Sequence, residues 1–359
     1  MSRPVQAMLD ADALTANLAR VRECAPGARV MAVVKANGYG HGLSWVAQHL
    51  QRAHVDALAV ASIEEALELR AGGIVEPPIC LLEGFFQAEE IAVAAQHRLE
   101  VVVHNYEQLT ALEAAPPLPR GLDVWLKLDT GMHRLGFPVA DAHQVYTRLR
   151  ACAAVQTLRM LSHFARADEP AESATDIQLN AFLQAAPPGV ERSIANSAAV
   201  LEWPRSRLEW VRPGLMLYGL SPLPERSASA LGLTPVMTLT SAVIAVHRLP
   251  QGAAVGYGGS FVCPEAMPVG VVAGGYGDGY PRHARAGTPV RIGSCCVPLI
   301  GRVSMDMITV DLRRRPETRV GDPVVLWGRD LPAEEIAVAA GTIPYTLVCG
   351  VTPRVPRRS

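Results

Sequence analysis

Residues 30–42 read Val-Met-Ala-Val-Val-Lys-Ala-Asn-Gly-Tyr-Gly-His-Gly, an apolar run that ends abruptly in a lysine and a glycine-rich turn. A continuous apolar run, rather than an alternating one, is typical of a parallel strand that is buried on both faces. Glycine then lets the backbone turn sharply and approach a ligand closely. The stretch therefore predicts a buried strand whose carboxyl end carries a polar turn suited to binding.

Similar apolar runs recur on the C-terminal side of this stretch, and helix-like segments separate them. The predicted strands are 30–34, 57–61, 79–82, 100–103, 124–128, 157–162, 192–195 and 208–211. The predicted helices include 12–24, 43–52, 63–71, 88–95 and 141–151. Eight such units over roughly 200 residues predict a (β/α)8 barrel of the TIM type.

The character of the chain changes near Ser221-Pro222-Leu223-Pro224. Val, Thr and Gly become more frequent after this point, and turn signals separate short apolar runs. These runs are 236–249, 269–273, 297–300, 308–312 and 324–326. The pattern favours an all-β domain. We therefore expect an α/β plus all-β chain, with the barrel in residues 1–228 and a C-terminal β-domain in residues 229–359.

Composition excludes several classes of protein. The chain has 359 residues, of which 49% are hydrophobic and 19% charged, so it can bury a large core. A net charge of −1 gives no reason to expect nucleic acid or an anionic membrane as a partner. No apolar stretch approaches the roughly 18 residues that span a bilayer, and no secretory signal is recognisable, so we expect a cytoplasmic protein. Seven scattered cysteines without a CxxC pair predict neither a metal site nor disulfides.

Lysine usage is the most unusual feature of the composition. Of the 33 basic residues, only Lys35 and Lys127 are lysines, and each follows an apolar run. GC-rich codon usage explains the general depletion but not these two positions. Arginine cannot form a Schiff base or act as a neutral amine base, so the two lysines suggest amine chemistry.

Polar residues follow the predicted strands at the end where barrels carry their chemistry. They lie in residues 35–42, 127–134, 162–164, 196–197 and 212–215. For Lys35, we favour a Schiff base to an aldehyde cofactor over a solvated surface lysine. Three groups could bind a phosphate: the Tyr39 hydroxyl after the first strand, Ser197 after the seventh and the Gly214-Leu215 backbone after the eighth.

Two arginines of the barrel suggest further contacts with a cofactor or a substrate. Arg212 would point into the mouth, where it could donate to a pyridine nitrogen and leave that nitrogen uncharged. His163 could support Arg212, although a histidine with a purely structural role is more common. Arg134 could hold a carboxylate or contact the cofactor, or it could form an ordinary surface ion pair.

The β-domain contains three glycine-rich segments, at 255–259, 274–280 and 301–306. Glycine–tyrosine loops usually form turns with a packed ring. A tyrosine such as Tyr257 becomes catalytic only where its surroundings favour the ionised form.

These segments together resemble a known family. Residues 33–42 closely resemble the cofactor-attachment motif of the alanine racemases, and further segments follow in the family's order. They are 127–136, 163–165, 196–197, 211–214, 255–258, 275–280 and 301–306. The resemblance implies a barrel plus a C-terminal β-domain that the extreme N-terminus joins. It also implies pyridoxal 5′-phosphate as cofactor and a head-to-tail homodimer in which each active site uses the partner's β-domain.

The resemblance implies a two-base mechanism for interconverting L- and D-alanine. Lys35 would hold the cofactor and exchange the D-alanine proton, and Tyr257 from the partner would exchange the L-alanine proton. Arg134 and the partner's Met305 would bind the substrate. Lys127 matches a lysine that is carbamylated in many members, and its negative charge would then orient Arg134.

The resemblance also implies the cofactor contacts. Tyr39, Ser197 and the Gly214-Leu215 backbone would hold the phosphate, and Arg212 would face the pyridine nitrogen.

Tyr276 and Arg302 are similar to residues of the family's entrance corridor. One departure concerns a tyrosine that many members place near the C-terminus, where it reaches the phosphate. In this chain the corresponding segment is Thr352-Pro353-Arg354-Val355-Pro356, and Pro353 has no donor with which to make this contact.

Three alternatives remain open from the sequence. A racemase of broader specificity would need a larger pocket, which the sequence does not reveal. A decarboxylase of the same barrel type usually has an acidic partner for the pyridine nitrogen, and Arg212 argues against it. A non-catalytic cofactor-binding protein would consist of the barrel alone, whereas this chain adds a domain with Tyr257 and Met305.

Overall fold

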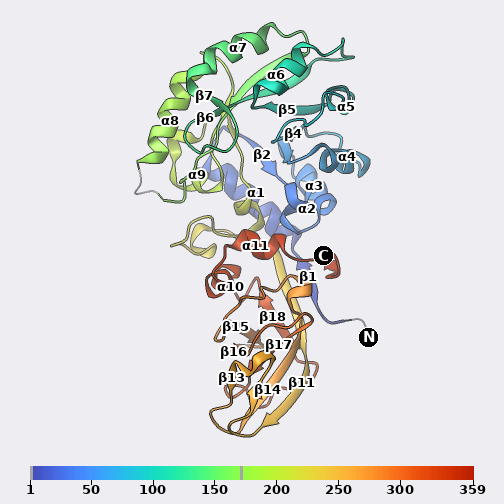
Figure 1. The fold of residues 1–359 in the computed structure, drawn as a ribbon, viewed down its shortest axis with the longest axis vertical. Coiled ribbons are helices and arrows are strands. Elements are labelled where there is room, and N and C mark those ends of the chain that lie inside the picture. Colours follow the sequence, from blue (N-terminus) through green and yellow to red (C-terminus); the bar gives the residue numbers. More distant parts are fainter. Residues whose placement is uncertain (1–2, 170–172) are drawn as a thin grey trace.

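Eight apolar runs of the chain form parallel strands that close into a barrel (Figure 1). The computed structural model describes residues 3–169 and 173–359. The barrel strands are β2 (Arg29–Val33), β3 (Ala57–Val60), β4 (Ile79–Leu81), β5 (Leu99–Val103), β6 (Leu122–Asp129), β8 (Val155–Leu161), β9 (Arg192–Ser193) and β10 (Trp210–Val211). Pairing of β5 with β6 completes the circle, since all other neighbours are already joined in the order β5-β4-β3-β2-β10-β9-β8-β6.

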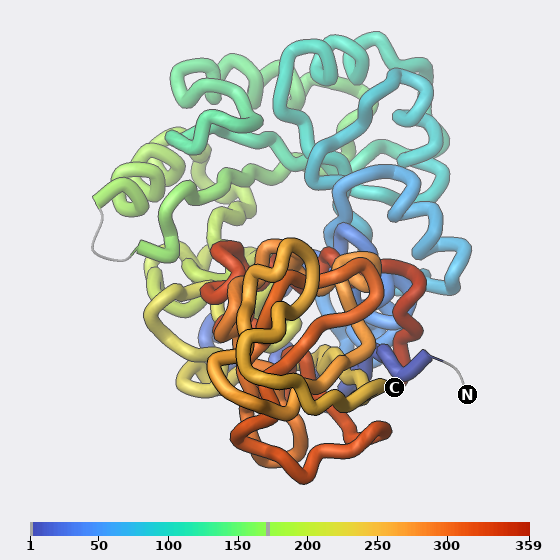
Figure 2. The backbone as a smooth tube through the Cα atoms, turned by 60° about the horizontal axis from the view of Figure 1, so that its bottom comes forward, coloured from blue at the N-terminus to red at the C-terminus, as the bar shows by residue number. Residues whose placement is uncertain are grey.

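The barrel strands are apolar because both of their faces are covered. Every residue of β3 and of β5 is buried. The surrounding helices are α1 (Ala11–Cys24), α3 (Leu43–Arg52), α4 (Ile63–Ala71), α5 (Glu90–Gln96), α6 (Tyr106–Glu113), α7 (Ala142–Ala151), α8 (Ala174–Ala185) and α9 (Ser197–Glu202). Figure 2 shows them, in blue to green, as the outer wall of the barrel. Asp10 begins α1 as its N-cap, accepting a hydrogen bond from the Ala13 amide at 2.9 Å.

A second, antiparallel sheet forms the lower domain in Figure 1. Its strands are β11 (Met237–Leu249), β14 (Met267–Ala273), β15 (Pro289–Ile292), β16 (Cys295–Ile300), β17 (Met307–Asp311) and β18 (Pro323–Trp327). The long strand β11 pairs with β18 along its first half and with β14 along its second, with a register shift between Val243 and Ala245. This double pairing closes the sheet on itself. The predicted fold class, a (β/α)8 barrel followed by a β-domain, is confirmed.

The first and last strands of the described chain both lie in the β-domain sheet. Strand β1 (Gln6–Leu9) pairs antiparallel with β11, and β19 (Arg357–Arg358) pairs parallel with β1. The chain therefore enters the barrel from this domain and returns to it afterwards.

The C-terminal part is not made of strands alone. Helices α10 (Ala333–Ala340) and α11 (Pro344–Cys349) lie near the junction of the barrel and the β-domain (Figure 1). Helix α10 buries Ile336, Ala337 and Ala340 on one face, and a proline begins α11, where its missing amide costs nothing. Both helices are too short for a clear helical period in the sequence. Among the described residues, no helix has the length and apolar composition needed to cross a membrane.

Candidate active site

A cavity of about 400 Å³ opens at the carboxyl ends of the barrel strands. Nine residues singled out in the sequence line it together: Lys35, Tyr39, Lys127, Arg134, His163, Ser197, Arg212, Gly214 and Leu215. They are spread over 181 positions of sequence, from 35 to 215, and the parallel topology of the barrel brings them to one mouth.

Lys35 stands at the start of a strained turn. The short element α2 (Lys35–Tyr39) contains Ala36, Asn37 and Tyr39 with φ of 53°, 56° and 50°. Left-handed backbone costs roughly 1–2 kcal/mol per residue other than glycine, so the surroundings must hold it. The Glu65 carboxylate accepts from the Ala36 amide at 2.7 Å, and the Asn37 side chain accepts from the Leu43 amide at 2.8 Å.

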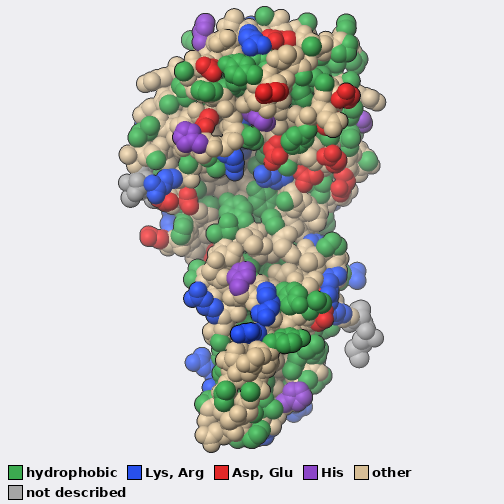
Figure 3. Space-filling model, viewed as in Figure 1, with side chains coloured by type: hydrophobic (Ala, Val, Ile, Leu, Met, Phe, Trp, Pro, Cys, Tyr) green, Lys and Arg blue, Asp and Glu red, His purple; other side chains and the backbone are tan. Residues whose placement is uncertain are grey.

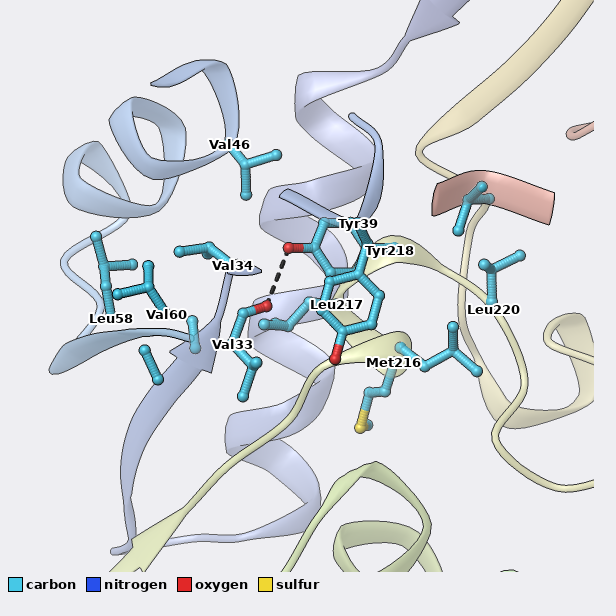
Figure 4. Close-up of a cluster of buried hydrophobic side chains, with 14 of the residues drawn as sticks. Val33, Val34, Tyr39, Val46, Leu58, Val60, Met216, Leu217, Tyr218 and Leu220 are labelled. Carbon is cyan, nitrogen blue, oxygen red and sulfur yellow. Dashed lines mark hydrogen bonds between the residues drawn. The ribbon is translucent and has the colours of Figure 1, made fainter. Parts of the chain in front are cut away.

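One end of the cavity is rich in neutral hydrogen-bonding groups. The Ser197 hydroxyl accepts from the Gly214 amide at 2.9 Å and orients the loop after β10. A Cβ on Gly214 would lie 2.5 Å from the Tyr39 hydroxyl oxygen, so only glycine lets that hydroxyl come so close. The Tyr39 ring stacks on Tyr218 with centroids 4.7 Å apart, and the Tyr218 hydroxyl donates to the Val33 carbonyl at 3.0 Å (Figure 4). Burial raises the pKa of Tyr39 well above its ordinary value, so this hydroxyl stays a donor.

Arg212 is almost completely buried at the centre of the mouth. Its guanidinium donates to the Ser193 hydroxyl at 2.7 Å, and it lies 3.4 Å from Nδ1 of His163. Burial lowers the pKa of Arg212 to about 10, so it remains a cation at neutral pH. Burial, and then the positive charge of Arg212, lowers the pKa of His163 well below its usual value. The neutral imidazole can therefore accept from Arg212.

Lys127 is the second lysine of the mouth, and it is only 8% exposed. Burial, followed by repulsion from Arg212 and Arg134, lowers the pKa of Lys127 to about 8. Its amine makes no hydrogen bond to any residue in the described ranges. A fraction of it is therefore neutral and nucleophilic near neutral pH.

The mouth as a whole is cationic. Among its described lining residues, Lys35, Lys127, Arg134 and Arg212 face a single carboxylate, that of Glu83. Arg134 is exposed and forms no ion pair within the part of the chain that the structure describes. The cavity thus suits a ligand with two anionic groups, of which one meets the neutral donors and the other a free guanidinium.

The β-domain residues that the sequence analysis assigned to the site do not line the cavity of their own chain. Tyr257 is 66% exposed, Met305 51% and Tyr276 40%, and Arg302 is exposed as well. Backbone bonds nevertheless fix part of this surface, because the Gly277 amide donates to the Met305 carbonyl at 2.9 Å.

Comparison with known proteins identifies the family. The family model "Alanine racemase, N-terminal domain" matches residues 9–222, and "Alanine racemase, C-terminal domain" matches residues 236–359. An alanine racemase of Nitrosococcus oceani is 55% identical over 98% of both chains, and a catabolic one of Pseudomonas putida is 51% identical over 99% of this chain and 98% of its own. The crystal structure of the biosynthetic alanine racemase of Pseudomonas aeruginosa superposes with a TM-score of 0.96, at 48% identity over 99% of both chains.

The chain belongs to the alanine racemase family. It is therefore an enzyme of an isomerase family, and its relatives include biosynthetic and catabolic alanine racemases. The non-catalytic alternative, a barrel without a second domain, is excluded because both family models match.

The alanine racemase mouth contains one aromatic residue that the sequence analysis missed. Tyr345, on α11, lines the cavity, and its ring centroid lies 5.9 Å from that of Tyr39. Burial raises the pKa of Tyr345 to about 12, so it too is a hydroxyl donor. Pro353 is exposed and does not line the cavity. The region near the C-terminus thus does present a tyrosine to the mouth, eight positions before Pro353. The sequence feature that could have located it is Pro344, which begins helix α11 directly before Tyr345.

Proposed function

We propose that this protein interconverts L- and D-alanine in the cytoplasm with pyridoxal 5′-phosphate as cofactor, in D-alanine supply for peptidoglycan or in its catabolism. The observation that carries the proposal is the convergence of an amine, a cluster of neutral donors and a buried guanidinium in one barrel mouth.

The residues of the mouth fit this cofactor. The Ser197 and Tyr39 hydroxyls and the Gly214-Leu215 backbone would hold the phosphate, in a space that a side chain on Gly214 would narrow. Lys35 would bind the aldehyde carbon, and Arg212 would donate to the pyridine nitrogen. When bound, the cofactor supplies an electron sink that makes the Cα–H bond of an amino acid acidic.

The chain's own residues would then move the proton. Racemisation needs two bases on opposite faces of one Cα, each able to return the proton that it takes. We assign Lys35 to the D-alanine proton and Tyr257 of a second copy to the L-alanine proton. Arg134 and the second copy's Met305 would hold the substrate, and Tyr276 and Arg302 would line its entrance.

Lys127 would act as a carbamate. Its neutral amine would attack the carbon of carbon dioxide, so that the N–C bond forms while one C=O π bond opens onto oxygen. The nitrogen then loses one proton to water, and the neutral amine becomes an anionic carbamate. That anion would pair with Arg134, which lines the same cavity.

A head-to-tail homodimer would complete the site. Residues 229–359, taken as the β-domain, contain 13 arginines against 9 acidic residues, a net charge of +4. Residues 1–228, taken as the barrel, contain 20 basic against 25 acidic residues, a net charge of −5. The face drawn in Figure 3 shows most of its acidic side chains on the barrel. A β-domain that meets the partner's barrel would pair these opposite charges and bring Tyr257 to a mouth.

Proton NMR of L-alanine with the purified protein and pyridoxal phosphate in D₂O, followed by chiral analysis, tests the proposal. We expect deuterium at Cα together with D-alanine. Exchange without inversion would mean that only one base works and would contradict the role of Tyr257. Absence of exchange would exclude alanine as the substrate.

A further inference from the structure

The C-terminal arm contains an arginine, Arg357, whose N–H donors are all used. A guanidinium has five N–H groups, and Arg357 makes five hydrogen bonds, all to backbone carbonyls. Nε and Nη2 donate to the Gly40 carbonyl at 3.0 and 2.8 Å, and the remaining bonds reach Val351, Thr352 and Val355 at 2.8–3.1 Å. The basic C-terminus is therefore not simply a solvated tail at this position.

The carbonyl that receives two of these bonds closes the turn of Lys35. Gly40 follows the left-handed residues of α2 and itself has φ of 78°. A Cβ on Gly40 would lie 1.9 Å from the Val348 carbonyl oxygen, so the turn packs directly on the backbone of α11. Arg357 thus joins the turn of the barrel to the segment that follows α11.

Four side chains hold this turn, and they act at different points. Glu65 binds the Ala36 amide at its start, and Asn37 binds the Leu43 amide beyond it. The His41 ring lies 3.1 and 2.8 Å from the carbonyl oxygens of Gly38 and Tyr39, within the turn. Arg357 binds the carbonyl at its end. Of these four, only Arg357 comes from outside the barrel, on a strand of the β-domain sheet.

We propose that Arg357 is a positioning residue for Lys35: its guanidinium fixes the end of the strained turn and so aims the amine at the cofactor and at the substrate proton. The inference rests on the proposed function. A lysine at position 357 would keep the charge, but its three donors cannot reproduce five bonds in one plane.

The test compares Arg357→Gln and Arg357→Lys with Arg358→Gln, which removes the same charge one position later from an exposed side chain. The readouts are the dissociation constant of pyridoxal phosphate, measured by titrating the cofactor-free protein, and kcat with L- and with D-alanine. We expect about tenfold weaker cofactor binding and about tenfold lower kcat for Arg357→Gln, as for loss of a charge-assisted hydrogen bond, with a smaller loss for Arg357→Lys. Arg358→Gln should stay within about twofold of the unmodified enzyme on both measures.

An isotope effect separates positioning from a general structural role. If Lys35 is misplaced, removal of the Cα proton of D-alanine by this lysine becomes more rate-limiting. The deuterium isotope effect on kcat/KM should then rise for Cα-deuterated D-alanine and not for the L-isomer. Equal changes for both isomers, or Arg357→Gln matching Arg358→Gln in cofactor binding, would overturn the inference. If Arg357→Gln does not fold, Arg357→Lys undergoes the same measurements. Failure of the unmodified enzyme to racemise alanine would instead contradict the proposed function.

Discussion

The barrel mouth and the loops of the β-domain differ in how firmly a single chain holds their polar and aromatic side chains in place. In the mouth, Arg212 and Lys127 are buried, and hydrogen bonds fix Arg212 before any ligand arrives. In the β-domain, Tyr257 and Met305 project from the surface and contact no part of the cavity. A single chain therefore holds the residues of the mouth in place by itself but leaves Tyr257 and Met305 exposed, where the proposed second copy would meet them.

Inactivating the mouth in one chain and the β-domain loop in another tests whether the two regions meet between chains. Lys35→Ala and Tyr257→Phe should each lower racemisation by on the order of 10³–10⁴-fold, since each removes one base. Mixed and allowed to exchange subunits, the two variants should regain about a quarter of the normal activity, because half of the dimers then contain one intact site. Chiral chromatography of alanine measures the recovery.

The control is a mixture of Lys35→Ala with a chain that contains both substitutions, which cannot form an intact site. If the first mixture stays as inactive as this control while subunit exchange is demonstrated, the two residues do not meet across an interface.

Substitutions of Lys127 test whether activity requires a negative charge beside Arg134. Replacing Lys127 by alanine should raise KM for alanine by roughly 10-fold to 100-fold, because Arg134 loses a charged partner. Lys127→Glu supplies a permanent carboxylate and should retain more activity than Lys127→Ala. The opposite order in steady-state kinetics would show that the lysine acts as a cation.

Tyr345 tests which C-terminal residue belongs to the mouth. Tyr345→Phe removes a hydroxyl from the cavity and should weaken pyridoxal phosphate binding by about three- to tenfold, the effect of one neutral hydrogen bond. Pro353→Ala, at an exposed position outside the cavity, should leave the dissociation constant within about twofold. Cofactor titration of both variants decides the matter, and a larger effect at position 353 would refute the assignment.

The last prediction concerns stability rather than catalysis. Since the pKa of Lys127 is about 8 in the folded chain and 10.5 for an ordinary lysine, the unfolded chain binds more protons between these values. The destabilising contribution of Lys127 is thus complete below pH 8 and is relieved as the pH rises to 10.5. Denaturant unfolding in CO₂-free buffer should show the unmodified protein gaining stability relative to Lys127→Met over this window. A constant difference would mean that the pKa of the buried amine is not lowered.

Much of the fold was predictable because burial leaves a direct signal in the sequence. A strand covered on both faces must be apolar throughout, and this located every barrel strand to within a few residues, as for β3. Helices α10 and α11 were missed because they are short, and contacts at the domain junction stabilise them more than their own pattern does.

The site was predictable to the extent that topology alone brings residues together. Lys35, Lys127 and Arg212 share a mouth because parallel strands end at one edge. The left-handed backbone at Ala36 and Asn37 was not predictable, since distant side chains hold it in that conformation. Arg357 was not predictable either, because its contact with Gly40 spans 317 positions and depends on how the two domains pack.

The pairing of β1 with β11 has a consequence for how the chain is made. Residues 6–9 leave the ribosome first, but their hydrogen-bond partners, residues 237–240, emerge after the whole barrel has been translated. At 5–20 residues per second, this first strand waits roughly 10–50 s with its edges open. Any folding of the barrel during synthesis therefore takes place while β1 lacks its partner β11, and translation arrested before residue 237 should leave residues 6–9 open to protease.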